Sequence, residues 1–228
     1  MESKSVLAIE TTNLERTYHV GNEAVRALRG IDLQIAKGQF IALKGRSGSG
    51  KTTLLNCLGG LDQPTNGAVI INGRLLTGLK EKELTNWRRS EVGFIFQSLG
   101  LLPSLSAFEN VELMLRISKL PRSQRAEHAK SCLEMVGLGK WADHRPYEMS
   151  GGQQQRVAIA RAIANNPQLI LADEATGELD SETTHEILDL FQAIVHEREI
   201  TMLLATHDNL VDEYVDQIIE LADGQISN

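Results

Sequence analysis

The sequence predicts an α/β fold built around a parallel β-sheet, and three features of the 228-residue chain support this prediction. Short apolar runs at residues 40–43, 169–172 and 202–205 are bounded by glycine, lysine or polar residues, which is typical of strands buried on both faces of a parallel sheet. Helical patterns lie between these runs. A glycine-rich loop follows the first run and precedes a helical segment, an order found in phosphate-binding α/β proteins.

The composition is that of an ordinary globular domain. A formal net charge of −7 at pH 7 argues against nucleic-acid binding, because an acidic protein repels a phosphate backbone at long range. The opening residues show no signal-peptide pattern, and no run of about 18 apolar residues occurs, so we expect a cytosolic chain that does not cross a membrane. The two cysteines, Cys57 and Cys132, lack metal-site spacing and are expected to be buried.

Helical periodicity is clearest in two segments of the predicted core. Residues 153–166 place small apolar side chains on one face, and Pro167 ends the pattern. A second helix is expected to begin near Ser181, which we take as its N-cap after Asp180.

The stretch from about residue 98 to residue 148 lacks strand-like runs and shows helical patterning interrupted by prolines. We interpret it as a helical subdomain inserted into a core formed by residues 1–97 and 149–228. No repeat or flexible linker is visible, so the 228 residues are expected to form a single domain.

The glycine-rich loop predicts a site for a nucleoside triphosphate. Its consecutive residues are Gly45, Arg46, Ser47, Gly48, Ser49, Gly50, Lys51 and Thr52, and Thr53 follows them in the helical run. Glycines allow successive backbone N–H groups to surround a polyphosphate at the positive end of a helix. Lys51 can reach the outer phosphates, and the Thr52 hydroxyl can ligate Mg²⁺. We assign these residues, apart from Arg46, to nucleotide binding.

Two adjacent carboxylates, Asp173 and Glu174, end the apolar run at residues 169–172. Ligands of α/β folds bind at the carboxyl edge of the sheet, so this pair is expected beside the phosphate loop. Asp173 is assigned to Mg²⁺, directly or through water, and Glu174 to general base for the attacking water. An acid pair that merely caps the next helix is the structural alternative.

A second anion-binding helix start is predicted at Ser150, Gly151, Gly152 and Gln153. Ser150 can cap the helix, and the two glycines let backbone N–H groups approach an anion closely. This stretch resembles the Leu-Ser-Gly-Gly-Gln signature of ATP-binding-cassette (ABC) ATPases, with Met149 at the usual leucine position.

The resemblance implies an ABC ATPase fold, with a RecA-like parallel core, an N-terminal antiparallel β subdomain and the inserted helical subdomain. It also implies a head-to-tail dimer in which each ATP lies between Lys51 of one copy and Ser150 of the other. By resemblance, Tyr18 stacks on adenine, Gln97 contacts Mg²⁺ or the attacking water, and His207 bonds the γ-phosphate. Asp180 is placed in the loop that crosses the dimer interface.

Two residues depart from the family pattern. Ala175 stands where proline is usual, and Glu178 stands where asparagine or another small neutral residue is common. Ala175 loosens the turn after the acid pair. Glu178 adds a negative charge near the triphosphate, and we expect this charge to lower the ATPase rate.

Within the family, the chain is most similar to ATPases of lipoprotein-releasing, macrolide-exporting and antimicrobial-peptide-resistance systems. This implies an Mg²⁺- and ATP-dependent subunit that drives a separate integral-membrane permease and is held by it at the cytoplasmic face of the membrane. One alternative is a regulatory ABC ATPase of a membrane complex that transports nothing. Another is a soluble ABC ATPase of DNA repair or translation, although the coiled-coil insertions and zinc cysteines of those proteins are absent from this sequence.

Overall fold

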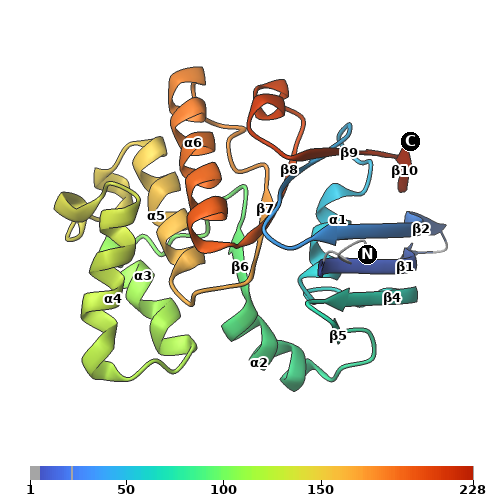
Figure 1. Cartoon of the computed structure of the whole chain (residues 1–228), viewed down its shortest axis with the longest axis horizontal. Helices are drawn as coiled ribbons and strands as arrows, with labels where there is room; N and C mark the ends of the chain where they lie inside the picture. Colours follow the sequence, from blue (N-terminus) through green and yellow to red (C-terminus); the bar gives the residue numbers. More distant parts are fainter. Residues whose placement is uncertain (1–5, 22, 228) are drawn as a thin grey trace, which may run out of the picture.

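A computed structural model of the chain describes residues 6–21 and 23–227. Its two sheets lie side by side, and a group of helices packs at the end of the larger sheet that is remote from the smaller one (Figure 1). The α/β fold predicted from the sequence is confirmed, including the antiparallel β subdomain.

The larger sheet has the strand order β10-β9-β3-β8-β7-β6. Its strands are β3 (Phe40–Lys44), β6 (Val92–Ile95), β7 (Leu169–Asp173), β8 (Thr201–Thr206), β9 (Gln217–Ala222) and β10 (Gln225–Ser227). All pairings among β6, β7, β8, β3 and β9 are parallel, whereas β10 runs antiparallel to β9. The three apolar runs identified in the sequence therefore form the three adjacent strands β7, β8 and β3, as expected for strands covered on both faces.

The register of these strands brings the predicted site residues to one edge. Lys44 at the end of β3 pairs with Thr206 of β8, and Asp173 at the end of β7 pairs with Ala205 of β8. The chain continues from these carboxyl ends into the phosphate loop, Glu174 and His207. Parallel strands thus place three sequence-distant segments at the same edge of the sheet.

The smaller sheet is antiparallel, with the order β2-β1-β4-β5. It consists of β1 (Leu7–Val20), β2 (Glu23–Ala36), β4 (Asn66–Ile71) and β5 (Arg74–Leu75). Its apolar residues pack with one face of the larger sheet and with α1 (Lys51–Leu58) in a continuous hydrophobic cluster. This packing positions β2 beside the phosphate loop.

The remaining helices are α2 (Glu81–Glu91), α3 (Ala107–Ile117), α4 (Arg122–Met135), α5 (Gly151–Ile163) and α6 (Ser181–Arg198), with short 3-10 helices at Gly139–Trp141, Pro146–Glu148 and Asn209–Glu213 (Figure 1). Helices α3, α4, α5 and α6 contribute to a second hydrophobic cluster, on the other face of the larger sheet, whereas Leu84 and Trp87 of α2 pack in the same cluster as α1. No strand occurs at residues 98–148 of the described chain, and we retain these bounds of the helical subdomain as a proposal.

The prediction that Ser181 is the N-cap of helix α6 is wrong by one residue. The N-cap is Asp180, whose side chain accepts a hydrogen bond from the Thr183 backbone N–H, and Ser181 is the first helical residue. A carboxylate at this position also interacts favourably with the helix dipole, which explains why Asp180 rather than Ser181 is the N-cap. The prediction that Cys57 and Cys132 are buried is confirmed.

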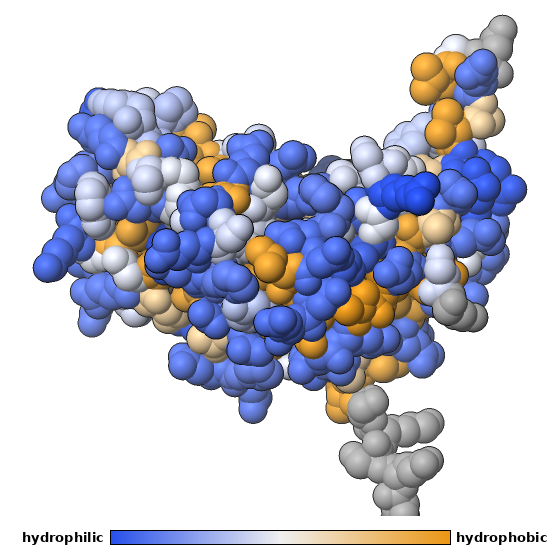
Figure 2. Space-filling view, turned by 90° about the horizontal axis from the view of Figure 1, so that it is seen from above, coloured by the Kyte–Doolittle hydropathy of each residue, from blue (hydrophilic) through white to orange (hydrophobic). Residues whose placement is uncertain are grey.

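Hydrophilic residues dominate the face seen in the space-filling view, and hydrophobic residues form small separate groups on it (Figure 2). No helix of the described residues is long and apolar enough to cross a membrane.

Candidate active site

The phosphate loop, residues 45–52, connects β3 to α1 by a backbone path that requires glycine. Gly50 has φ 108°, and a Cβ there would lie 2.6 Å from the Ala27 carbonyl oxygen. A Cβ on Gly45 would lie 2.2 Å from the Leu221 carbonyl oxygen. Because any side chain at these positions would collide with backbone, the loop is held tightly against β2 and β9.

Lys51 begins α1 and folds back over this loop. Its Nζ atom donates to the Gly45 carbonyl oxygen at 2.8 Å and lies 3.5 Å from Oε1 of Glu174. Only 7% of Lys51 is exposed, so its charge is concentrated inside the loop. A buried ammonium held at the phosphate loop and the start of a helix is suited to binding the outer phosphates of a nucleotide.

The carboxylates at the end of β7 lie beside Lys51 but differ in their surroundings. Burial raises the pKa of Asp173, and a hydrogen bond with Thr52 opposes that rise. Its Oδ1 atom is buried without a hydrogen-bond partner among the described residues. An unsatisfied carboxylate oxygen next to a threonine hydroxyl fits the hard oxygen ligands that Mg²⁺ prefers.

Glu174 adopts a left-handed backbone conformation with φ 49°, which is uncommon for a residue other than glycine. This conformation turns its side chain toward the end of β8, where Oε2 accepts a hydrogen bond from Nδ1 of His207 at 2.9 Å. Its carboxylate is therefore fixed between Lys51 and His207. Strained backbone of this kind is concentrated at functional sites.

A cavity of about 790 Å³ joins these groups. Gln97, after β6, and His207, after β8, line it together with Glu174 and most of the phosphate loop. The structure thus brings together Ser47, Gly48, Gly50, Lys51, Thr52, Thr53, Gln97, Glu174 and His207 in one cavity. Ser49 lines a neighbouring cavity that includes the other side of the loop.

Tyr18 lies on β1 opposite Val25, which lines the cavity, but Tyr18 itself is not a lining residue. The Arg16 guanidinium carbon lies 4.4 Å from the centre of its ring. Its hydroxyl donates to Oδ2 of Asp62 at 2.6 Å, and Asp62 also pairs with Arg16 at 2.8 Å. These contacts fix the orientation of the ring, and its stacking on adenine remains a prediction.

The second predicted phosphate site lies apart from this cavity. Ser150 caps α5 as expected, because its Oγ accepts from the Gln153 N–H at 3.3 Å and its own N–H donates to Gln153 Oε1 at 2.9 Å. Neither Ser150, Gly151, Gly152 and Gln153 nor Asp180 is among the described residues that line the 790 Å³ cavity. Within one chain, the Ser150 helix start therefore does not line the cavity that contains the Lys51 loop.

Sequence reasoning missed several residues of the cavity wall. Arg26 and Arg29 come from β2, Arg46 from the loop itself, and Asp223 from the turn between β9 and β10. Together with Lys51 the arginines make this region basic, although the chain carries a net charge of −7. A local excess of cations favours an anionic ligand such as a triphosphate. Arg46 could have been noticed, because it interrupts a run of small residues, whereas the β2 arginines depend on sheet register.

Comparison with known proteins agrees with this geometry. The family model described as "ABC transporter" matches residues 28–177. The ABC transporter ATP-binding protein YtrE of Bacillus subtilis is 44% identical over 220 residues, covering 95% of this chain and 95% of that protein. The macrolide export ATP-binding/permease protein MacB of Hyphomonas neptunium is 46% identical over 218 residues, which cover 96% of this chain and 34% of that protein.

A solved structure of the ATP-binding cassette MJ0796 of Methanocaldococcus jannaschii has a TM-score of 0.89 to this chain at 43% identity, covering 96% of this chain and 97% of that one. It is described as a dimeric post-hydrolysis state bound to ADP and Pi. A second dimeric structure of MJ0796 has the same TM-score of 0.89.

Proposed function

The chain belongs to the ABC transporter family, and from this premise we propose that it is the ATP-hydrolysing, energy-coupling subunit of a membrane transporter. The similarity to ATP-binding subunits extends over 96% of the chain, so it includes both predicted phosphate sites. One relative is itself a macrolide exporter, and we extend the proposal to export.

The observation that carries this proposal is the division of the site within one chain. Lys51, Glu174 and His207 meet in one cavity, whereas the Ser150 helix start lies outside it. A second copy arranged head to tail would bring its Ser150 to the open side of this cavity and complete two equivalent sites. The dimeric relatives support this arrangement.

The residues of this chain divide the reaction among them. We propose that Lys51 neutralises charge on the outer phosphates, that Glu174 takes the proton of the attacking water, and that His207 bonds the γ-phosphate. Asp173, Thr52 and Gln97 would hold Mg²⁺, which supplies charge neutralisation at the phosphate oxygens when it is bound. Catalysis then depends chiefly on positioning and electrostatics.

The test uses a variant that binds ATP but does not hydrolyse it. Glu174→Gln with ATP and Mg²⁺ should sediment as a dimer, whereas Lys51→Ala in the same background should remain a monomer because it lacks the phosphate contact. A strictly monomeric Glu174→Gln protein at high concentration, even together with its membrane partner, would refute the head-to-tail site.

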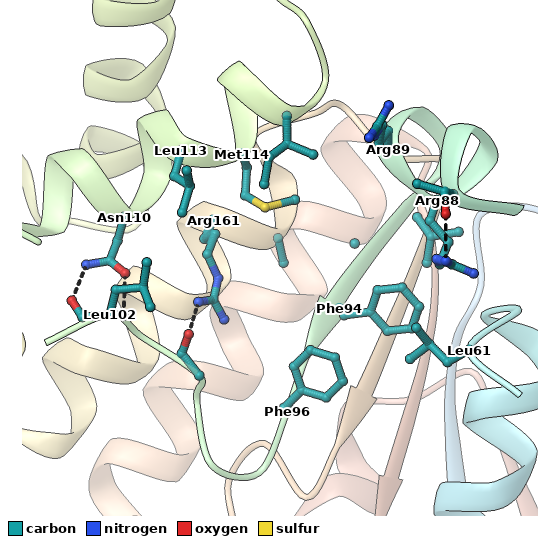
Figure 3. A pocket seen from close by; sticks show the side chains of 16 residues that line it. Leu61, Arg88, Arg89, Phe94, Phe96, Leu102, Asn110, Leu113, Met114 and Arg161 are labelled. Atoms are coloured by element: carbon teal, nitrogen blue, oxygen red, sulfur yellow. Dashed lines mark hydrogen bonds between the residues drawn. The ribbon is translucent and has the colours of Figure 1, made fainter. Parts of the chain in front are cut away.

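The partner is proposed to be an integral-membrane permease, and a groove in this chain supports that proposal (Figure 3). The groove has a volume of about 620 Å³ and lies between β6, α2 and α3. Four of its large apolar side chains are 40–46% exposed, namely Leu61, Phe96, Leu102 and Ile117. Exposed apolar residues gathered in one concave site are typical of a protein interface.

The walls of this groove are preorganised. The rings of Phe94 and Phe96 stack with centroids 5.6 Å apart. Arg161 donates to the carbonyl oxygens of Leu99 and Gly100, and Asn110 accepts from the Leu102 N–H at 2.8 Å. The loop that these bonds fix begins at Gln97, which also lines the nucleotide cavity. A permease helix bound here would sense nucleotide state through Gln97, and it would hold the subunit at the cytoplasmic face of the membrane.

A transporter subunit and a regulatory subunit would both need this ATPase site and this groove, so neither feature distinguishes the two functions. Substrate movement into vesicles that contain both subunits supports the transporter proposal, and ATP hydrolysis without movement would favour a regulatory subunit.

A further inference from the structure

Two exposed residues of opposite charge, Arg46 and Glu178, have no assigned part in the proposed reaction, although Arg46 lines the nucleotide cavity. Arg46 is the second residue of the phosphate loop, and Glu178 lies in the turn between Glu174 and α6. In the part of the chain that the structure describes, neither forms an ion pair within 4.0 Å. Their neighbours are engaged, because Lys51 pairs with Glu174 and Asp180 binds Thr183.

The turn that carries Glu178 is fixed against the Ser150 helix start. A Cβ on Gly151 would lie 3.9 Å from Leu179 Cδ2, and a Cβ on Gly152 would lie 2.7 Å from Thr183 Cγ2. The turn is closed by backbone bonds from Gly177 to Glu174 at 3.2 Å and from Leu179 to Thr176 at 3.1 Å. Wherever the Ser150 helix start docks, the turn that carries Glu178 therefore docks beside it.

Arg46 has a fixed backbone and an exposed side chain. Its carbonyl oxygen accepts from the Ser49 N–H at 3.1 Å, and it is a second acceptor for Lys51 Nζ at 3.4 Å. Arg46 lines both cavities that flank the loop. Asp223 lines the same two cavities but forms no ion pair with Arg46 in the described structure. The guanidinium is thus free to meet an acid from outside the chain.

We propose that Arg46 of one copy forms an ion pair with Glu178 of a second copy when the two copies close around ATP. The inference rests on the head-to-tail dimer proposed above. When a Ser150 helix start approaches the triphosphate in the Lys51 loop, the attached Glu178 turn arrives beside that loop. Twofold symmetry then gives two such pairs in each dimer.

This pair explains the two charged residues together. A glutamate near a triphosphate would repel it unless a cation of the opposite copy neutralises the glutamate. Arg46 is the exposed cation of the loop that the glutamate approaches. Charge pairs at an interface contribute chiefly to correct pairing and to the rate of association, so the pair would select head-to-tail closure.

The test measures ATP-dependent dimerisation by sedimentation in the Glu174→Gln background. Arg46→Glu and Glu178→Arg should each weaken the dimer at least about tenfold, because each creates two like-charge contacts. An equimolar mixture of the two single variants should recover dimers to within about threefold of the parent, because each contact then holds either the native pair or its reversed counterpart. Glu127→Arg, an exposed acid on α4, is the matched control for net charge and should leave the dimer unchanged.

The outcomes separate this proposal from the one on which it rests. A parent that fails to dimerise refutes the head-to-tail site itself. A parent that dimerises, with both variants unchanged or with a mixture no better than the single variants, refutes only the Arg46–Glu178 pair. A fluorescent ATP analogue reports nucleotide binding in parallel. Loss of binding by Arg46→Glu that the mixture does not restore would also overturn the pair and assign Arg46 to the nucleotide of its own copy.

Discussion

Lys44 and Asp212 form an ion pair of 2.8 Å that joins the end of β3 to the 3-10 helix after His207. The same ammonium donates to Asn209 Oδ1 at 2.6 Å. The residue before the phosphate loop is therefore bonded directly to the segment that follows His207. Lys44 is the last residue of β3 and follows four buried apolar or aromatic residues. No local sequence pattern predicts that it forms an ion pair.

Replacement of this lysine should reduce stability. In Lys44→Met we expect the free energy of unfolding to fall by about 1–3 kcal/mol, because hydrogen bonds to a charged group are lost and Asp212 can only partly rehydrate. Urea denaturation followed by circular dichroism measures this change. Lys37→Met, at an exposed lysine, is the control and should have no measurable effect. Equal stability of the two variants would show that the ion pair contributes nothing.

The ionised side chain of Asp173 should lower the stability of the folded, nucleotide-free protein. Its pKa is raised by burial, so the ionised carboxylate destabilises the fold, and that cost is absent below the ordinary pKa and fully present above the raised one. Asp173→Asn should therefore raise the Tm at pH 7 without nucleotide, by about 2–4 °C if the gain is about 1 kcal/mol. The gain should vanish at low pH. Scanning calorimetry compares it with Asp189→Asn, an exposed control, and an unchanged or lower Tm would contradict the prediction.

The two cysteines should resist thiol reagents. Burial raises the pKa of the Cys57 thiol to about 12 and that of Cys132 to about 11. Because the thiolate is the reactive species, neither should react with a disulfide reagent at pH 8 in the folded protein, and both should react in urea. Absorbance of the released thiol measures this. Rapid modification of the folded chain would show that these positions open to solvent.

The groove beside Gln97 should be required for the membrane partner but not for nucleotide binding. Ile117→Glu places a charge among its apolar walls and should reduce recovery of an integral-membrane protein from detergent-solubilised membranes at least about tenfold. Leu75→Glu is the matched control, because Leu75 is 51% exposed and does not line the groove. Equal recovery with both variants would exclude the groove as the docking site.

Segments with local signals were predicted well from the sequence. The strand, glycine-rich loop and helix around Lys51 were recognised because each residue type has a local backbone role. The serine cap of α5 was likewise predicted, since capping depends on residues three positions apart. At α6 the choice between Asp180 and Ser181 was wrong, because both residues can cap and only the observed backbone decides between them.

Contacts between distant segments could not be predicted from the sequence. Lys44 meets Asp212 across a separation of 168 residues, and Tyr18 meets Asp62 only because β1 pairs with β4 in one particular register. The apolar groove depends in the same way on how α3 packs beside β6. Such contacts depend on how distant segments pack together, and the hydrophobic periodicity of a single sequence does not predict that packing.

The separation of Lys51 from Ser150 within one chain has a genetic consequence for the proposed dimer. An allele defective at Lys51 and an allele defective at Ser150 would each be inactive alone, since both nucleotide sites of the homodimer would contain the defect. Expressed together, they would form mixed dimers in which one site carries both lesions and the other carries none. The two inactive alleles should therefore complement each other, whereas two lesions within the same loop should not.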